Sequence, residues 1–329
     1  MKADTRKRLE LFMKNAETIR KGISMTTGED RRMAALLYAV NGKVMNRAAV
    51  ENSYAVLKKG AGILSPFRGS TPLGVAALLS LKADPKVTFD SAKDAYGKLR
   101  DIKFRSSEFL ALAAIQIAAG AEPKDHQVVV NRMRSFYDKM KANNWLYTGA
   151  DDYVLAAMFA LSGADEKTTV DGIDALYQKL KPEFKAKGSV LALAQVMALG
   201  KQTDAAAVKR VIALRDALKE KKIRLDVSYA VPTLGILALL PVGAEAIAQE
   251  ILEAEEFLRA QSGMGKLSVS NTEIQLYAAS LAASVYAKDS ALIAASVSTV
   301  MTNIIIAQMM LILFIVIASS ATIAAASSG

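Results

Sequence analysis

Two kinds of helical segment alternate along the chain. The first kind is rich in alanine and apolar on every side, and its copies lie at 33–40, 74–81, 110–117, 154–161, 191–198, 234–240 and 276–282. Equivalent positions in successive copies are separated by 37 to 43 residues. A helix without a polar face has to be buried on more than one side. The spacing therefore predicts a repeated unit of about 40 residues.

The second kind of segment is amphipathic, with lysines on the face opposite its apolar stripe. Its mark is an aromatic residue followed three positions later by an apolar one, as in Tyr54/Leu57, Tyr96/Leu99, Tyr137/Met140 and Tyr177/Leu180. Residues three and four apart share one face of a helix, so Val50, Tyr54 and Leu57 are expected to form one buried stripe. By the same spacing, the segment around Phe12 is the first helix of this kind.

The alternation predicts an all-α fold of about seven helical-hairpin repeats that occupy residues 1–289. Amphipathic helices would form one layer and fully apolar helices a second layer behind them. Two architectures satisfy this pattern: an open α-solenoid, in which each repeat contacts only its neighbours, and a closed α/α toroid. The repeats begin on an amphipathic helix and end on an apolar one, which favours closure.

The last 40 residues form a separate region, 290–329, because no charged residue follows Asp289. Within it, residues 304–323 would span about 30 Å as a helix, which is the thickness of a bilayer core. We therefore expect a hydrophobic C-terminal helix that acts as a membrane tail anchor. The same segment also suits a helix enclosed by the protein itself or by an oligomer interface, and this alternative stays open.

Charge and cysteine content narrow the expected location. The formal net charge is +10 and the pI is about 9.5, a balance that attracts anionic lipid or nucleic acid. The first 15 residues are charged throughout and lack the apolar core of a signal peptide. The chain has no cysteine, which excludes disulfides and thiolate chemistry. We expect the cytoplasmic side of the cell membrane, with a single-pass C-terminal anchor, or alternatively a soluble cytoplasmic protein.

Candidate catalytic residues gather near the starts of the apolar helices. In a toroid the starts of these inner helices would converge on one rim, where carboxylates could perform acid–base hydrolysis or bind carbohydrate. The helix dipole also favours acidic residues at these positions, so capping is the alternative interpretation. The candidates for such a rim site are Asp30, Arg68, Arg105, Glu108, Asp151 and Asp152.

Other chemistries have little support in the sequence. His126 is the only histidine, at the expected start of an amphipathic helix, where we expect a surface or capping residue. One histidine excludes histidine-rich metal sites, and a Ser-His-Asp arrangement would have to use it. We therefore expect no metal and no cofactor.

Three short patterns resemble a known family. They are Phe12-x-x-Asn-x-x-x-Ile-Arg-Lys-Gly22, Glu29-Asp30 before Ala34-Ala35-Leu36, and the segment from Thr302 to Gln308. With the chain length, they resemble a family of Gram-positive bacterial proteins known as domain of unknown function 4003. The resemblance implies a bacterial protein without an established activity, and it supplies no catalytic residues.

The leading functional hypothesis is a helical-repeat interaction or scaffold protein. It would bind a protein partner and contact membrane lipid through its C-terminal helix. The first alternative is an α/α-toroid hydrolase or carbohydrate-active enzyme that uses the rim carboxylates. A weaker alternative is a nucleic-acid binder driven by charge, although the aromatic residues lie on the expected buried stripe and nucleic acid is not the expected partner.

Overall fold

The computed structural model describes residues 1–20 and 26–288, together with Ala307. In this part of the chain the secondary structure consists of α-helices and short 3-10 helices, without a strand. The expected all-α class is therefore confirmed. The longer helices are α1 (Ala3–Arg20), α2 (Gly28–Val40), α3 (Arg47–Gly60), α4 (Pro72–Ser80), α5 (Pro85–Asp101), α6 (Glu108–Gly120), α7 (His126–Asn143), α8 (Tyr153–Leu161), α9 (Glu166–Leu180), α10 (Lys187–Leu199), α11 (Ala205–Glu220), α12 (Val231–Ala238), α13 (Ala244–Arg259) and α14 (Asn271–Tyr286).

Within the described residues, five 3-10 helices stand in the connections. They are η1 (Pro66–Arg68), η2 (Pro123–Asp125), η3 (Ala150–Asp152), η4 (Lys181–Glu183) and η5 (Ser228–Ala230). Local sequence sets many of the starts: Asn46, Asp84, Ser107, Asp204 and Ser270 each accept a backbone N–H from the first turn of the following helix. The expected helix boundaries thus follow from ordinary capping chemistry.

The described chain divides into two compact units. Unit 1 holds residues 1–15, 38–44 and 171–288, and unit 2 holds residues 16–20, 26–37 and 45–170. The division passes through α1, α2 and α9, so each of these helices contributes to both units.

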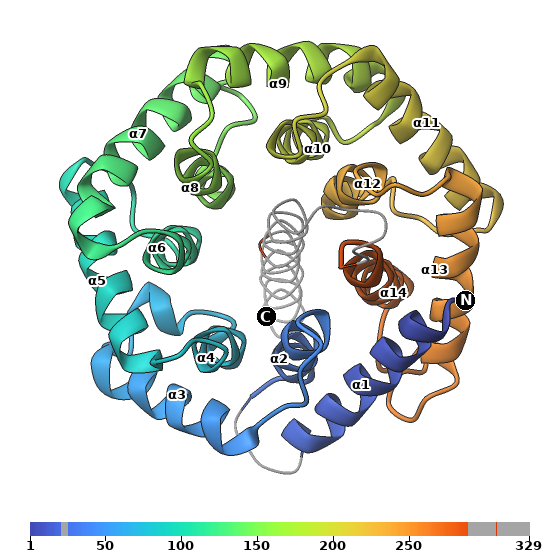
Figure 1. Cartoon of the computed structure of the whole chain (residues 1–329), viewed down its shortest axis with the longest axis horizontal. Helices are drawn as coiled ribbons and strands as arrows, with labels where there is room; N and C mark the ends of the chain where they lie inside the picture. Colours follow the sequence, from blue (N-terminus) through green and yellow to red (C-terminus); the bar gives the residue numbers. More distant parts are fainter. Residues whose placement is uncertain (21–25, 289–306, 308–329) are drawn as a thin grey trace, which may run out of the picture. The chain divides into compact units, whose positions relative to one another are not determined.

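Unit 2 has two layers of helices. α3, α5 and α7 run lengthwise across the view of Figure 1 in one layer, whereas α4, α6 and α8 are seen end-on in the other. Each lengthwise helix packs against the end-on helix that follows it, and α6 also packs against α8. The end-on helices are buried nearly all round, as in α4 from Leu73 to Leu79, while α5 buries one stripe that includes Phe89, Ala92 and Leu99.

Unit 1 repeats this two-layer arrangement. α11, α13 and residues 3–15 of α1 lie in one layer, and α10, α12 and α14 lie in the other (Figure 1). The first residues of the chain contact its last described helices: the Lys2 N–H donates to Glu250 Oε1 over 2.9 Å. The rings of Phe12 and Tyr277 are 5.3 Å apart between centroids. α1 is therefore packed against α13 and α14.

Seven alanine-rich segments of the sequence lie in α2, α4, α6, α8, α10, α12 and α14. The prediction for the amphipathic helices needs one correction in α3, where Ser53, not Tyr54, joins Val50 and Leu57 on the buried stripe. The Ser53 hydroxyl donates to the Ala49 carbonyl over 2.8 Å, so its burial leaves no unpaired donor.

No helix in the described residues has both the length and the apolar character needed to cross a bilayer. The predicted tail helix at 304–323 lies outside the described residues, apart from Ala307.

Candidate functional site

Asp30 is a buried carboxylate that joins two helices of unit 2. It lies in the first turn of α2 and is 2% exposed. Its two oxygens accept the backbone N–H groups of Leu73 over 3.0 Å and of Gly74 over 2.8 Å, at the start of α4. Burial raises the pKa of Asp30 to about 6, and the two amide hydrogen bonds oppose that shift. Asp30 thus caps a neighbouring helix rather than its own.

Glu108 and Asp152 also bind groups at helix starts. Glu108, the first residue of α6, accepts both the N–H and the hydroxyl of Ser70 just before α4, over 2.9 and 2.6 Å. Asp152 is buried, and its Oδ2 accepts the Gly149 N–H over 2.8 Å. Such contacts are what the alternative interpretation, in which these carboxylates cap helices, predicts. The catalytic role assigned to these carboxylates stays a prediction.

The remaining three predicted residues lie nearer the solvent. Arg105 and Asp151 are exposed, and Arg68 is half-buried at the end of η1. Each lies in a connection that leads into α4, α6 or α8. The sequence therefore placed all six residues in such connections or in first turns, although the described contacts do not join them in one catalytic group.

The expectation that His126 lies at the surface was wrong. His126 does begin α7, as predicted, and its backbone caps the end of η2, but its side chain is 0% exposed and is not at the surface. Its Nδ1 lies 3.2 Å from Asp94 Oδ2, and its Nε2 lies 3.4 Å from Ser91 Oγ. Ser91 and Asp94 are one turn apart on α5, so the imidazole ties α7 to α5.

The contacts run from serine to histidine to aspartate, as in a catalytic triad. The histidine and the carboxylate, however, have exchanged which of them is buried. In such triads the carboxylate is buried and orients the histidine. Here the histidine is the buried member, while the Asp94 side chain is 47% exposed and also forms an ion pair with Lys98. The cluster therefore acts as an interhelical hydrogen-bond network.

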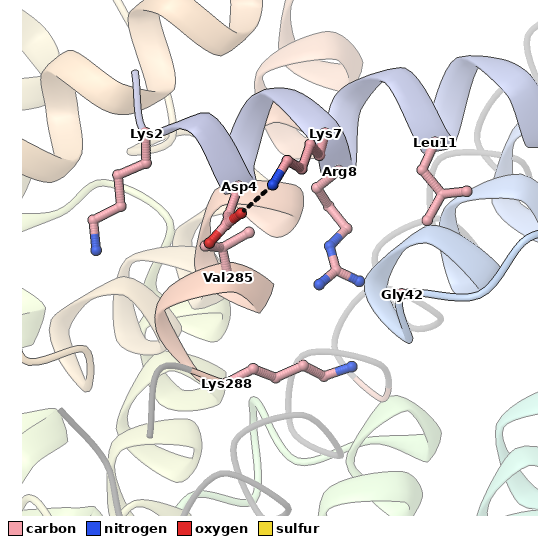
Figure 2. Close-up of a pocket in the computed structure, with 8 residues that line it drawn as sticks. All are labelled: Lys2, Asp4, Lys7, Arg8, Leu11, Gly42, Val285 and Lys288. Atoms are coloured by element: carbon pink, nitrogen blue, oxygen red, sulfur yellow. Dashed lines mark hydrogen bonds and ion pairs between the residues drawn. The ribbon is translucent and has the colours of Figure 1, made fainter. Parts of the chain in front are cut away.

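An open pocket of about 460 Å³ lies in unit 1, between the beginning of α1 and the end of α14. Figure 2 shows the side chains of Arg8 and Lys288 reaching toward the same space from these two elements. Four of the lining residues are basic and one is acidic; the set is Lys2, Asp4, Lys7, Arg8, Leu11, Gly42, Val285 and Lys288.

Backbone carbonyls at the end of α2 hold two of these cations in place. Arg8 Nη1 donates to the Ala39 carbonyl over 2.7 Å, and Lys288 Nζ donates to the Val40 carbonyl over 3.2 Å. The carboxyl end of a helix carries a partial negative charge, which stabilises cations there. Gly42 allows this approach, because its φ is +71° and a Cβ at this position would lie 2.5 Å from Arg8 Nη1.

The electrostatics of the pocket favour an anion. Burial, together with the positive charges of Arg8 and Lys43, lowers the pKa of Lys288 to about 8. Burial also lowers the pKa of Arg8. The only carboxylate of the lining, Asp4, forms a 3.2 Å ion pair with Lys7 at an exposed position. A bound anion would relieve the repulsion between the Arg8 and Lys288 charges.

The sequence contained one partial signal for this pocket, the excess of basic residues in the first 22 positions. Nothing in the sequence connected those residues with Lys288. Among the described residues, no group of three or more His, Asp or Glu side chains could hold a metal ion.

Comparison with known families shows to which family the chain belongs. A family model described as "Protein of unknown function (DUF4003)" matches residues 17–310. The chain belongs to the DUF4003 family. The resemblance seen in the sequence is therefore confirmed. No curated protein and no solved structure matches this DUF4003 protein.

Proposed function

We propose that this DUF4003 protein is a helical-repeat binding protein that captures an anionic group in the pocket formed by α1, the end of α2 and the residues after α14. The observation that carries the proposal is the set of four cations around one open pocket with a single, already paired carboxylate. A phosphate or carboxylate group on a partner molecule has the chemistry that such a pocket accepts.

We also infer that the repeats close into a toroid. In an open solenoid each repeat contacts only its neighbours. In unit 1, however, Lys2 and Phe12 of the first helix contact Glu250 and Tyr277 near the other end of the repeats. This contact favours closure, and one of its residues, Lys2, also lines the pocket.

Inorganic phosphate is the simplest probe of the pocket. Phosphate is expected to bind the protein at pH 7, and Lys288→Gln is expected to weaken binding about five- to thirtyfold, since a charge-assisted hydrogen bond contributes roughly 1–2 kcal/mol. Raising the pH from 7 to 9 should weaken binding more in the unaltered protein than in Lys288→Gln, because the Lys288 ammonium with a pKa of about 8 loses its proton, whereas the second ionisation of phosphate affects both proteins alike. Isothermal titration calorimetry measures both effects.

The matched control is Lys86→Gln, which removes an exposed lysine that is paired with Asp90 in unit 2. It should bind phosphate as the unaltered protein does. If Lys86→Gln and Lys288→Gln weaken binding equally, or if Lys288→Gln shows the same pH dependence as the unaltered protein, the pocket does not bind the anion.

The second proposed property is a tether to the membrane through residues 304–323. Its support is the sequence: 40 positions without charge and an Ile- and Leu-rich stretch of bilayer length. Fractionation of cell membranes should find the full chain in the membrane pellet and a chain ending at Asp289 in the supernatant. Equal amounts of both chains in the supernatant without detergent would contradict the tether.

The hydrolase alternative has less support from the described contacts. Asp30, Glu108 and Asp152 each accept a backbone N–H at a helix start, and Asp30 is too buried to reach a substrate. A scaffold role with a protein partner agrees with the anion-binding proposal, because the captured group can belong to a protein.

A further inference from the structure

The starts of α4, α6 and α8 lie together at one edge of unit 2. Glu108, the first residue of α6, binds Ser70 just before α4. The Phe104 ring, just before α6, packs against the ring of Tyr153, the first residue of α8, with 4.9 Å between centroids. Both η1 and η3 also pack against α6. The three connections that lead into these helices therefore share this edge.

Bulky apolar side chains protrude from two of these connections. Ile63 and Leu64 follow α3, and Leu64 is 97% exposed. Trp145, Leu146 and Tyr147 follow α7, and Trp145 is 73% exposed. Exposed apolar clusters on a protein surface mark interaction sites more often than isolated apolar residues do. Here they stand on the connections between helices.

The same edge is strongly basic. We define the basic edge as residues 57–71, 98–107 and 140–152, each the last turn of a lengthwise helix with the connection after it. These segments carry eight Lys or Arg and three Asp residues, and one of the three, Asp152, is buried. The equivalent segments after α4, α6 and α8 (77–84, 117–125 and 158–165) carry two basic and four acidic residues.

The direction of the helices adds to the positive charge of the basic edge. Because α4, α6 and α8 all start at the basic edge, the positive ends of their dipoles lie there as well. In unit 1, taken by itself, the connection from α13 to α14 has the same character, with a fully exposed Leu267 beside Lys266.

We propose that the basic edge docks on an anionic membrane surface, with Leu64 and Trp145 entering the interface between lipid headgroups and acyl chains. Aromatic and aliphatic side chains prefer this interface, and Lys and Arg near it gain from the negative surface potential. Two separated apolar loops surrounded by dispersed cations fit an extended lipid surface.

The docking goes beyond capture of an anion by the pocket of unit 1, and it does not require the tail. Tail insertion would depend little on lipid charge, whereas docking of the basic edge requires anionic lipid. The two properties are therefore separable in the full-length protein.

Trp145 is the only tryptophan of the chain and reports on the edge directly. Vesicles of phosphatidylcholine with phosphatidylglycerol should shift the Trp145 emission of the full-length protein to shorter wavelength, and high salt should reverse the shift. Vesicles of phosphatidylcholine alone should not cause it. An equal shift with neutral vesicles, or no shift with anionic ones, would overturn the proposal whatever the tail does.

Charge reversal supplies the matched variants. The double variant Lys58→Glu/Lys59→Glu should weaken the vesicle affinity measured by this shift at least about tenfold, because each cation near an anionic surface contributes on the order of 1 kcal/mol. The variant Lys82→Glu/Lys124→Glu makes the same change in net charge in the segments after α4 and α6. It should leave the affinity within about twofold.

The contribution of the exposed apolar side chains to docking is tested by the double variant Ile63→Ser/Leu64→Ser. This variant changes exposed side chains and leaves the core unaltered. It should also reduce vesicle affinity. Equal losses in the two charge-reversed variants, or a Trp145 shift with heparin or a protein extract but none with anionic vesicles, would assign the edge to a different partner and refute membrane docking.

Discussion

Replacement of Phe12 by alanine is expected to lower the free energy of unfolding by about 3–5 kcal/mol, the usual cost of removing a buried phenylalanine. The Phe12 side chain is fully buried in the contact between α1 and α14, where its ring packs against Tyr277. Truncation leaves a cavity that the surrounding helices can fill only in part. Urea unfolding followed by circular dichroism measures the change.

A matched control lies next to it on α1. Met13 is only partly buried, so Met13→Ala should change stability by no more than about 1 kcal/mol. If Phe12→Ala cost no more than Met13→Ala, α1 would not be packed against α14 in solution. The inferred closure of the repeats would then lose its main support.

The second large effect is expected at Asp30. Asp30→Ala should lower the free energy of unfolding by about 2–4 kcal/mol at pH 7, because it leaves two buried N–H groups at the start of α4 without an acceptor. Thermal and urea unfolding both measure this loss. A cost below about 0.5 kcal/mol would show that solvent replaces the carboxylate, contrary to its burial.

The pH dependence gives an independent test of the same residue. The pKa of Asp30 is raised from 3.8 to about 6, so between these values the folded protein binds a proton that the unfolded chain does not. The resulting contribution to stability is fully present below pH 4 and is lost as the pH rises through 6. It amounts to at most about 3 kcal/mol.

Asp30→Asn isolates this contribution, since the amide does not titrate. The difference in stability between the unaltered protein and Asp30→Asn should therefore shift against the unaltered protein as the pH rises from 4 to 7. A difference that is constant over this range would mean that the pKa of Asp30 is not raised.

The helices could be predicted from the sequence because their signal is local. A helical segment without a polar face removes its apolar surface from water only when it is buried inside the protein. The helices α4, α6 and α8 are buried in this way. Capping residues marked the helix starts in the sequence because capping is also a local interaction. Asp30 is an exception, since it caps the next apolar helix along the chain instead of its own.

The features that the sequence missed depend on partners far along the chain. The burial of His126 rests on Ser91 and Asp94, more than 30 positions earlier. The pocket joins Arg8 to Lys288, and neither residue type nor spacing indicates that pairing. The exposure of Leu64 and Trp145 on the basic edge could not be predicted either, because leucine and tryptophan are usually buried and only the position of the connections shows that these two are exposed.

The packing of α1 against α13 and α14 has a consequence for biosynthesis. Lys2 and Glu250 are 248 positions apart, so at about 5–20 residues per second a ribosome needs roughly 12–50 s between them. During that interval the apolar face around Phe12 has no α14 to cover it. α1 therefore completes its packing only after α14 has been made, and until then it offers chaperones a binding segment.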